Sequence, residues 1–97
     1  MSNSVTPEIA EQLIEDQGLN INIPNNYTSI GYNAFHRKNL ASVTIPSTIT
    51  SIEKSAFSFN NLTNIDIPES VTFIGEHAFV SNKLQSMQIP TTLTSIG

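Results

Sequence analysis

The residues of this chain that could carry chemistry are few and widely spaced. His36, His77 and the adjacent Glu76 are the side chains best suited to ligate a metal or to transfer a proton. A metal site requires ligands that converge within a few ångströms. The two histidines occupy different positions of the sequence repeat described below, so we expect them in separate exposed loops. Glu76 and His77 are neighbours in an extended segment, where successive side chains point apart.

Motifs for catalysis or cofactor binding are not found in the sequence. The chain has no cysteine, no glycine-rich phosphate loop, and no grouping of serine, histidine and acid that matches a known nucleophile motif. We therefore predict no catalytic residue, no metal site and no cofactor. The sequence indicates that the chain is not an enzyme.

The dominant feature of the sequence is a repeat of 22 residues. Residues 40–61 recur as residues 62–83, a looser copy precedes them at 18–39, and a partial copy fills 84–97. A unit of this size is too small to bury its own apolar side chains, so neighbouring units must stack. Equivalent residues should then lie on one another, as in the columns Leu40, Leu62 and Leu84, Ile45, Ile67 and Ile89, and Phe35, Phe57 and Phe79.

Each repeat contains a short alternating segment that predicts a strand. Val43 and Ile45 alternate with Ser42 and Thr44, which is the period of a strand with one buried face. Successive coils run in the same direction, so we expect these strands to stack as one parallel sheet, each ending at a proline. A second extended piece, such as residues 49–52, should lie on another face.

The segment between one repeat and the next is expected to turn the chain. Residues 54–57 should form a turn or a single helical turn that packs Ala56 and Phe57 inward. The three phenylalanines at this position would then form one internal stack.

Residues 1–17 precede the repeats. Residues 1–5 are mostly polar and are expected to be a flexible start. Thr6, Pro7 and Glu8 have the features of a helix N-terminus, and Gly18 those of a helix C-terminus. We predict an amphipathic helix over about residues 7–17 that caps the first coil. Its apolar face would consist of Ile9, Ala10, Leu13 and Ile14. The rival interpretation is a helix that binds a membrane surface or a partner.

The net charge of −4 lies entirely in the N-terminal segment, because the acids and bases of the repeats balance. Nucleic-acid binding needs a basic face and is therefore not expected. No apolar run approaches the ~18 residues of a membrane span, so membrane insertion is not expected. The N-terminus lacks the basic and apolar regions of a signal peptide. The sequence leaves the localisation open.

The pattern L-x-x-[VIM]-x-I-P-x-x-[IVL]-x-x-I-x-x-x-A-F resembles the BspA-like leucine-rich repeats over residues 18–97. This resemblance implies a mostly β solenoid, a leucine-rich repeat whose 22-residue coils form a parallel sheet on one face. It also implies protein binding or adhesion at the cell surface or in secretion, and it supplies no catalytic residues. Gly18 and Tyr27 depart from the pattern, both in the first coil, where terminal repeats are commonly atypical. A parallel β-helix is the rival architecture.

The expected organisation is an N-terminal segment of residues 1–17 followed by an array of residues 18–97. The coils would be 18–39, 40–61, 62–83 and a partial coil at 84–97. The outward side chains of the predicted sheet form a candidate surface for a protein or a glycan, with a merely solvated face as the alternative. These residues are Asn20, Asn22, Ser42, Thr44, Asn64, Asp66, Ser86 and Gln88.

The last coil forms a second candidate surface, because its apolar side chains and its strand edge would lack a neighbour. Its residues are Leu84, Met87, Ile89, Leu93 and Ile96. The sequence thus predicts a non-catalytic interaction module that binds protein or glycan through a polar surface. The alternatives are a structural unit that forms a homodimer through the last coil, and a fragment of a longer surface protein.

Overall fold

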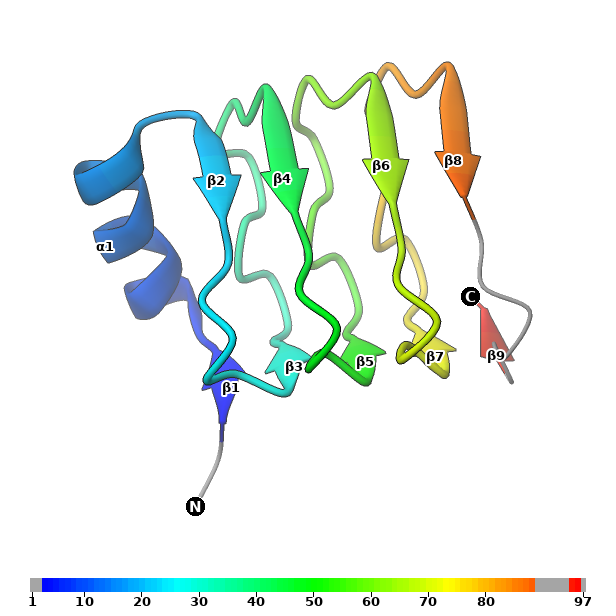
Figure 1. The fold of residues 1–97 in the computed structure, drawn as a ribbon. Helices are drawn as coiled ribbons and strands as arrows, with labels where there is room; N and C mark the ends of the chain where they lie inside the picture. Colours follow the sequence, from blue (N-terminus) through cyan, green and yellow to red (C-terminus); the bar gives the residue numbers. More distant parts are fainter. Residues whose placement is uncertain (1–2, 89–94, 97) are drawn as a thin grey trace.

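The fold was analysed in a computed structural model that describes residues 3–88 and 95–96 (Figure 1). The chain begins with the short strand β1 (Ser4–Val5) and the helix α1 (Pro7–Gln17). Short strands then alternate between two faces of the molecule. They are β2 (Asn20–Asn22), β3 (Ser29–Ile30), β4 (Ser42–Thr44), β5 (Ser51–Ile52), β6 (Asn64–Asp66), β7 (Phe73–Ile74), β8 (Ser86–Gln88) and β9 (Ser95–Ile96).

The odd-numbered strands form one continuous parallel sheet of five strands in the order β1-β3-β5-β7-β9. From β3 onward each pairing joins residues one repeat apart, so that Ile30 lies beside Ile52 and Ile52 beside Ile74. Figure 1 shows these strands in one row, with the even-numbered strands in a second row. The predicted stacking of repeats in parallel is confirmed for these strands.

The even-numbered strands do not form the single sheet that the sequence predicts. β2 pairs with β4 and β6 pairs with β8, but β4 and β6 belong to separate two-stranded sheets. Each three-residue strand forms few ladder hydrogen bonds, and each of these contributes only about 0.5–1.5 kcal/mol net. On this face the prediction of one continuous sheet was therefore wrong.

The phenylalanines form the predicted internal stack. The ring centroids of Phe35 and Phe57 are 5.3 Å apart with an interplanar angle of 3°, and those of Phe57 and Phe79 are 5.5 Å apart at 4°. Phe35 and Phe57 are fully buried, and Phe79 is half-buried against the same core. These spacings exceed the ~4.8 Å between hydrogen-bonded strands. The coils are in ladder register at the odd-numbered strands, whereas the row of even-numbered strands is interrupted between β4 and β6.

The turns that carry the phenylalanines share one backbone conformation. Ser55 and Phe59 have φ values of 58° and 59°, and their equivalents in the neighbouring turns are also left-handed. Main-chain hydrogen bonds join each turn to the next, as from the Phe57 N–H to the Ala78 carbonyl at 2.8 Å. Ala56 and Phe57 point inward and are fully buried, as predicted.

Two asparagines tie the turns together from within, and the sequence analysis missed both. The Asn60 amide nitrogen donates to the carbonyls of Phe35, Phe57 and Ser58 at 2.7, 2.9 and 3.2 Å. Its oxygen accepts from the main-chain N–H groups of Lys38 and Leu40 at 3.1 and 2.9 Å. Asn60 is only 5% exposed, so these bonds replace water for main-chain groups inside the turn.

Asn82 repeats this arrangement one coil later. Its amide nitrogen donates to the carbonyls of Phe57 and Phe79 at 2.8 and 3.0 Å, and its oxygen accepts from the Leu62 N–H at 3.1 Å. Each asparagine thus bonds to the carbonyl of a phenylalanine in its own coil and to that of the preceding coil. The same side chains therefore fix the turn and the distance between neighbouring turns.

Helix α1 has the bounds that the sequence predicts. The Thr6 hydroxyl accepts a hydrogen bond from the Ile9 N–H at 3.2 Å, and Gly18 follows the helix with φ of 80°. Ala10 and Leu13 are buried against the core, and Ile9 and Ile14 pack beside them. The helix lies along the outer side of β2 (Figure 1).

Polar contacts also join α1 to the repeats. The Gln17 side chain donates to the Asn22 carbonyl at 3.0 Å and accepts from the Asn22 N–H at 2.7 Å, as a neighbouring strand would. The Lys38 ammonium lies 2.7 Å from the Glu11 carboxylate. These contacts hold the helix against the first coil.

The start of the chain differs from the flexible segment that the sequence predicts. Ser4 and Val5 form β1, which pairs with β3, and Val5 is fully buried. The Asn3 carbonyl accepts from the Thr28 N–H at 2.8 Å. A two-residue strand has no periodicity to detect, and its stability comes from a pairing partner 25 residues away.

We predict that Phe57→Ala lowers the free energy of unfolding by about 3–5 kcal/mol, because it removes the middle ring of a buried stack. Phe73→Ala is the matched control, since Phe73 is 37% exposed on β7. Urea unfolding followed by circular dichroism measures both changes. Equal losses for the two variants would contradict the role of the stack.

We predict that Asn60→Ala lowers the free energy of unfolding by about 3 kcal/mol or more, because several buried main-chain groups lose their partner together. The neighbouring Asn61 is exposed, so Asn61→Ala should have little effect. Thermal melting of the two variants is the measurement. A similar melting temperature for both would show that water can replace the Asn60 amide.

Candidate functional site

The predicted surface consists of outward side chains on the even-numbered strands. In β2, β4 and β6 the central residues Ile21, Val43 and Ile65 are buried. The flanking residues are exposed, because side chains alternate along a strand. They are Asn20, Asn22, Ser42, Thr44, Asn64 and Asp66. Ser86 and Gln88 lie in β8, where the backbone register pairs them with Asn64 and Asp66.

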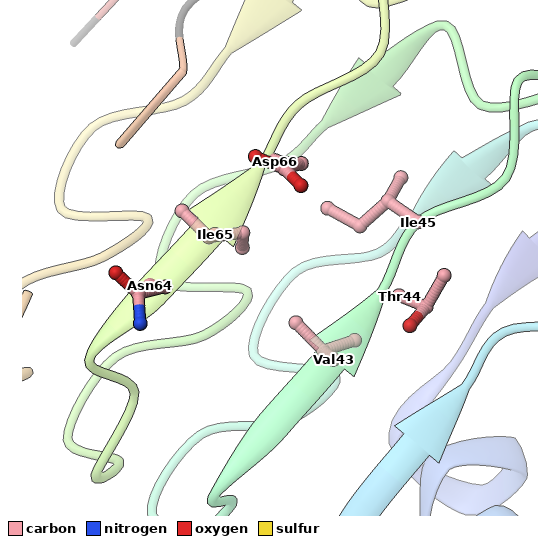
Figure 2. Close-up of a pocket in the computed structure, with 6 residues that line it drawn as sticks. All are labelled: Val43, Thr44, Ile45, Asn64, Ile65 and Asp66. Carbon is pink, nitrogen blue, oxygen red and sulfur yellow. The ribbon is translucent and has the colours of Figure 1, made fainter. Parts of the chain in front are cut away.

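The separation of β4 from β6 divides this surface and opens a hollow in it. The hollow has a volume of about 150 Å³ and lies between the two strands (Figure 2). On the β2–β4 side of the division the Ser42 hydroxyl donates to the Asn20 side chain at 2.8 Å. The residues that line the hollow are Val43, Thr44, Ile45, Asn64, Ile65 and Asp66.

The lining of the hollow combines an apolar base with a polar rim. Val43, Ile45 and Ile65 are 3–8% exposed and form the base. Thr44 and Asp66 are exposed at the rim, and Figure 2 shows the Asp66 side chain on the side of β6 that faces Ile45. Such a hollow can hold one small group while Asp66 accepts a hydrogen bond from it.

The two histidines lie apart from this surface. Neither His36 nor His77 lines the hollow between β4 and β6. Among the residues that the structure describes, no group of three or more His, Cys, Asp or Glu side chains is placed to hold a metal ion.

The residues of the second predicted surface are only partly described. Leu84 is half-buried and packs against the core. Met87 and Ile96 belong to β8 and β9. Ile89 and Leu93 lie outside the described residues. Self-association through the last coil stays a prediction.

A third cluster, on the rim of the turns, was not singled out as a site by the sequence analysis. The Arg37 guanidinium carbon lies 4.3 Å from the centre of the Phe59 ring, and the His36 ring meets Phe59 edge-on at 5.6 Å. The His36 Nδ1 lies 2.5 Å from the Ser58 hydroxyl, which is buried. The signal was present in the repeat, because Arg37 and Phe59 occupy the same position in neighbouring coils.

His36 therefore differs from the exposed loop histidine that the sequence predicts. It is half-buried between the Ser58 hydroxyl and the Arg37 side chain. Phe59 of the next coil covers the His36 ring. The position of His36 in the sequence does not by itself predict this contact.

The repeat geometry agrees with a comparison against known protein families. The family model of the BspA type leucine rich repeat region, described as six copies, matches residues 15–97. The chain belongs to this family. The resemblance drawn from the Ile-Pro and Ala-Phe positions is thus confirmed, and membership indicates a repeat interaction module. No curated protein and no solved structure matches the chain.

The structure also bears on whether the chain could cross a membrane. Among the described residues, no helix has the length and apolarity that crossing a membrane requires.

Proposed function

We propose that this BspA-type repeat chain is a non-catalytic interaction module that binds a protein or a glycan through the outward face of β2, β4, β6 and β8. The observation that carries this proposal is the hollow between β4 and β6, because it gives an otherwise flat polar face a defined binding point. The two columns of exposed polar side chains on either side would supply the surrounding hydrogen bonds.

The size and lining of the hollow define what it could accept. A volume of about 150 Å³ suits one side chain of a protein or one edge of a sugar ring. The apolar base of Val43, Ile45 and Ile65 would contact carbon atoms, while Asp66 would accept a hydrogen bond from a hydroxyl or an amide. The face lacks the Trp, Tyr and Arg side chains that usually anchor tight interfaces, which favours weak binding.

We propose in addition that residues 18–97 form a solenoid with coils 18–39, 40–61, 62–83 and 84–97, and that α1 is its N-terminal cap. The burial of Ala10 and Leu13 and the two hydrogen bonds from Gln17 to Asn22 support the capping role. The side chain of Gln17 satisfies the main-chain groups that the edge of β2 would otherwise leave to water.

We expect the double variant Thr44→Arg with Asp66→Arg to lose binding by about tenfold or more, because two long cations would fill the hollow and reverse its charge. Binding is measured on a glycan array and on a panel of immobilised proteins. The control is Tyr32→Arg with Glu15→Arg, which places the same residues at two exposed positions off this face. A double variant that binds as well as the control would refute the site.

We expect Gln17→Ala to lower the free energy of unfolding by about 1 kcal/mol, since it removes both hydrogen bonds to the edge of β2. Gln12→Ala is the matched control on the same helix, because Gln12 bonds only to the exposed Asp16 among the described residues. Hydrogen exchange at the Asn22 amide provides a local measurement. Unchanged protection of this amide in Gln17→Ala would contradict capping by Gln17.

A further inference from the structure

The Arg37 side chain is held in place without a carboxylate partner among the described residues. Its guanidinium lies over the Phe59 ring at 4.3 Å, and its Nε donates to the His36 Nε2 at 3.2 Å. The ion pairs that the structure describes join Lys38 to Glu11 and Lys54 to Glu76. No described residue accepts from the two terminal amino groups of Arg37.

A chain of hydrogen bonds fixes the direction in which Arg37 points. The Ser58 hydroxyl donates its one proton to the Ser55 carbonyl at 3.1 Å. It must therefore accept from His36 Nδ1, 2.5 Å away, so His36 carries its proton on Nδ1. The His36 Nε2 is then an acceptor, and it takes the Nε–H of Arg37. His36 is thus a positioning residue that leaves the outer donors of Arg37 available.

An apolar hollow adjoins Phe59. It has a volume of about 300 Å³ and is lined by Ser55, Phe59, His77 and Val80. Phe59 and Val80 are 41% and 38% exposed, and both line this hollow. Arg37 belongs to the coil before Phe59, and His77 and Val80 to the coil after it. The cation and the hollow therefore both adjoin one aromatic ring.

We propose that this rim binds an extended acidic segment of a partner protein, with a carboxylate on Arg37 and an apolar side chain in the hollow. Arginine binds carboxylates in a two-pronged geometry, and the outer edge of a guanidinium fixed at Nε is the part that remains for it. The hollow has an apolar lining that favours an aliphatic side chain over a sugar, whose hydroxyls would lose water there.

The distance between Arg37 and the hollow defines which sequence of a partner segment could reach both. The Arg37 guanidinium lies 4.3 Å from the centre of the Phe59 ring, and the hollow extends from this ring to His77 and Val80 of the next coil. A carboxylate on Arg37 and a side chain in the hollow would thus be separated by about one to two coil spacings, roughly 5–10 Å. In an extended peptide, residues i and i+2 point to the same side about 7 Å apart. The reach of a glutamate side chain covers the difference. The matching segment thus carries Glu at one position and an apolar residue two positions later.

The test is a titration of the isotope-labelled chain with the peptide Ac-Gly-Glu-Gly-Leu-Gly-NH2, observed by nuclear magnetic resonance. We expect saturable shifts at the Arg37 Nε–H and at the amides of Phe59, His77 and Val80. The peptide with Gln in place of Glu should bind about five- to tenfold more weakly, because it loses the charge-assisted hydrogen bonds. Arg37→Gln should weaken the Glu peptide equally and leave the Gln peptide unchanged.

Two controls keep the outcome specific. Ac-Gly-Glu-Leu-Gly-Gly-NH2 has the same composition but places the two side chains on opposite sides, so it should bind more weakly. The sheet-face variant with Thr44→Arg and Asp66→Arg should bind the Glu peptide as the original chain does. Failure of the sheet-face proposal and failure of the rim proposal are therefore separate results.

The proposal is overturned if the Glu and Gln peptides bind equally, if Arg37→Gln leaves the binding of the Glu peptide unchanged, or if neither peptide binds. It is also overturned if the shifts fall on β4 and β6, or if a glucuronate disaccharide binds where the peptide does not. Arg37→Lys offers a check on folding, because it keeps the charge and loses the planar geometry. The Glu peptide should bind this variant with intermediate affinity.

Discussion

The stacking of equivalent side chains from one coil on those of the next is the interaction on which this structure depends. No single 22-residue unit could exclude water from its own isoleucines and leucines. The parallel rings of Phe35, Phe57 and Phe79, which lie 5.3 and 5.5 Å apart, show this principle directly. Because each ring contacts the next, a change in one coil is transmitted to its neighbours, and no coil has a stability of its own.

This constraint also explains how polar groups are distributed. Turns that wrap a row of phenylalanines would bury main-chain N–H and C=O groups, and Asn60 and Asn82 satisfy several of them within and between coils. At the other end of the core, Gln17 supplies the two main-chain-like bonds that β2 lacks on its outer side. At these described positions, amide side chains supply hydrogen bonds that a neighbouring strand or turn would otherwise make.

The two candidate surfaces arise from the same geometry in different ways. Ladder pairing joins the odd-numbered strands in one sheet, whereas β4 and β6 belong to separate sheets and the hollow on the polar face lies between them. On the rim, left-handed residues such as Phe59 turn side chains outward, where no further core can cover them. There the ring of Phe59 meets Arg37 from the preceding coil, and a cation is fixed beside an apolar hollow. Neither surface needs residues beyond those that the repeat already places.

The sequence by itself determined which phenylalanines stack on one another, where the helix begins and ends, and which side chains of β2, β4 and β6 face outward. These properties follow from the period of the repeat and from the residue types at the ends of the helix, both of which can be read along the sequence. Only the tertiary structure decided that β4 and β6 separate, that Ser4 and Val5 form a strand, and that His36, Arg37 and Phe59 form one cluster. Those features depend on the distance between coils and on the direction of side chains at left-handed positions. The same repeat length is compatible with more than one distance between coils and with more than one direction of these side chains. The packing of the whole core selects between them.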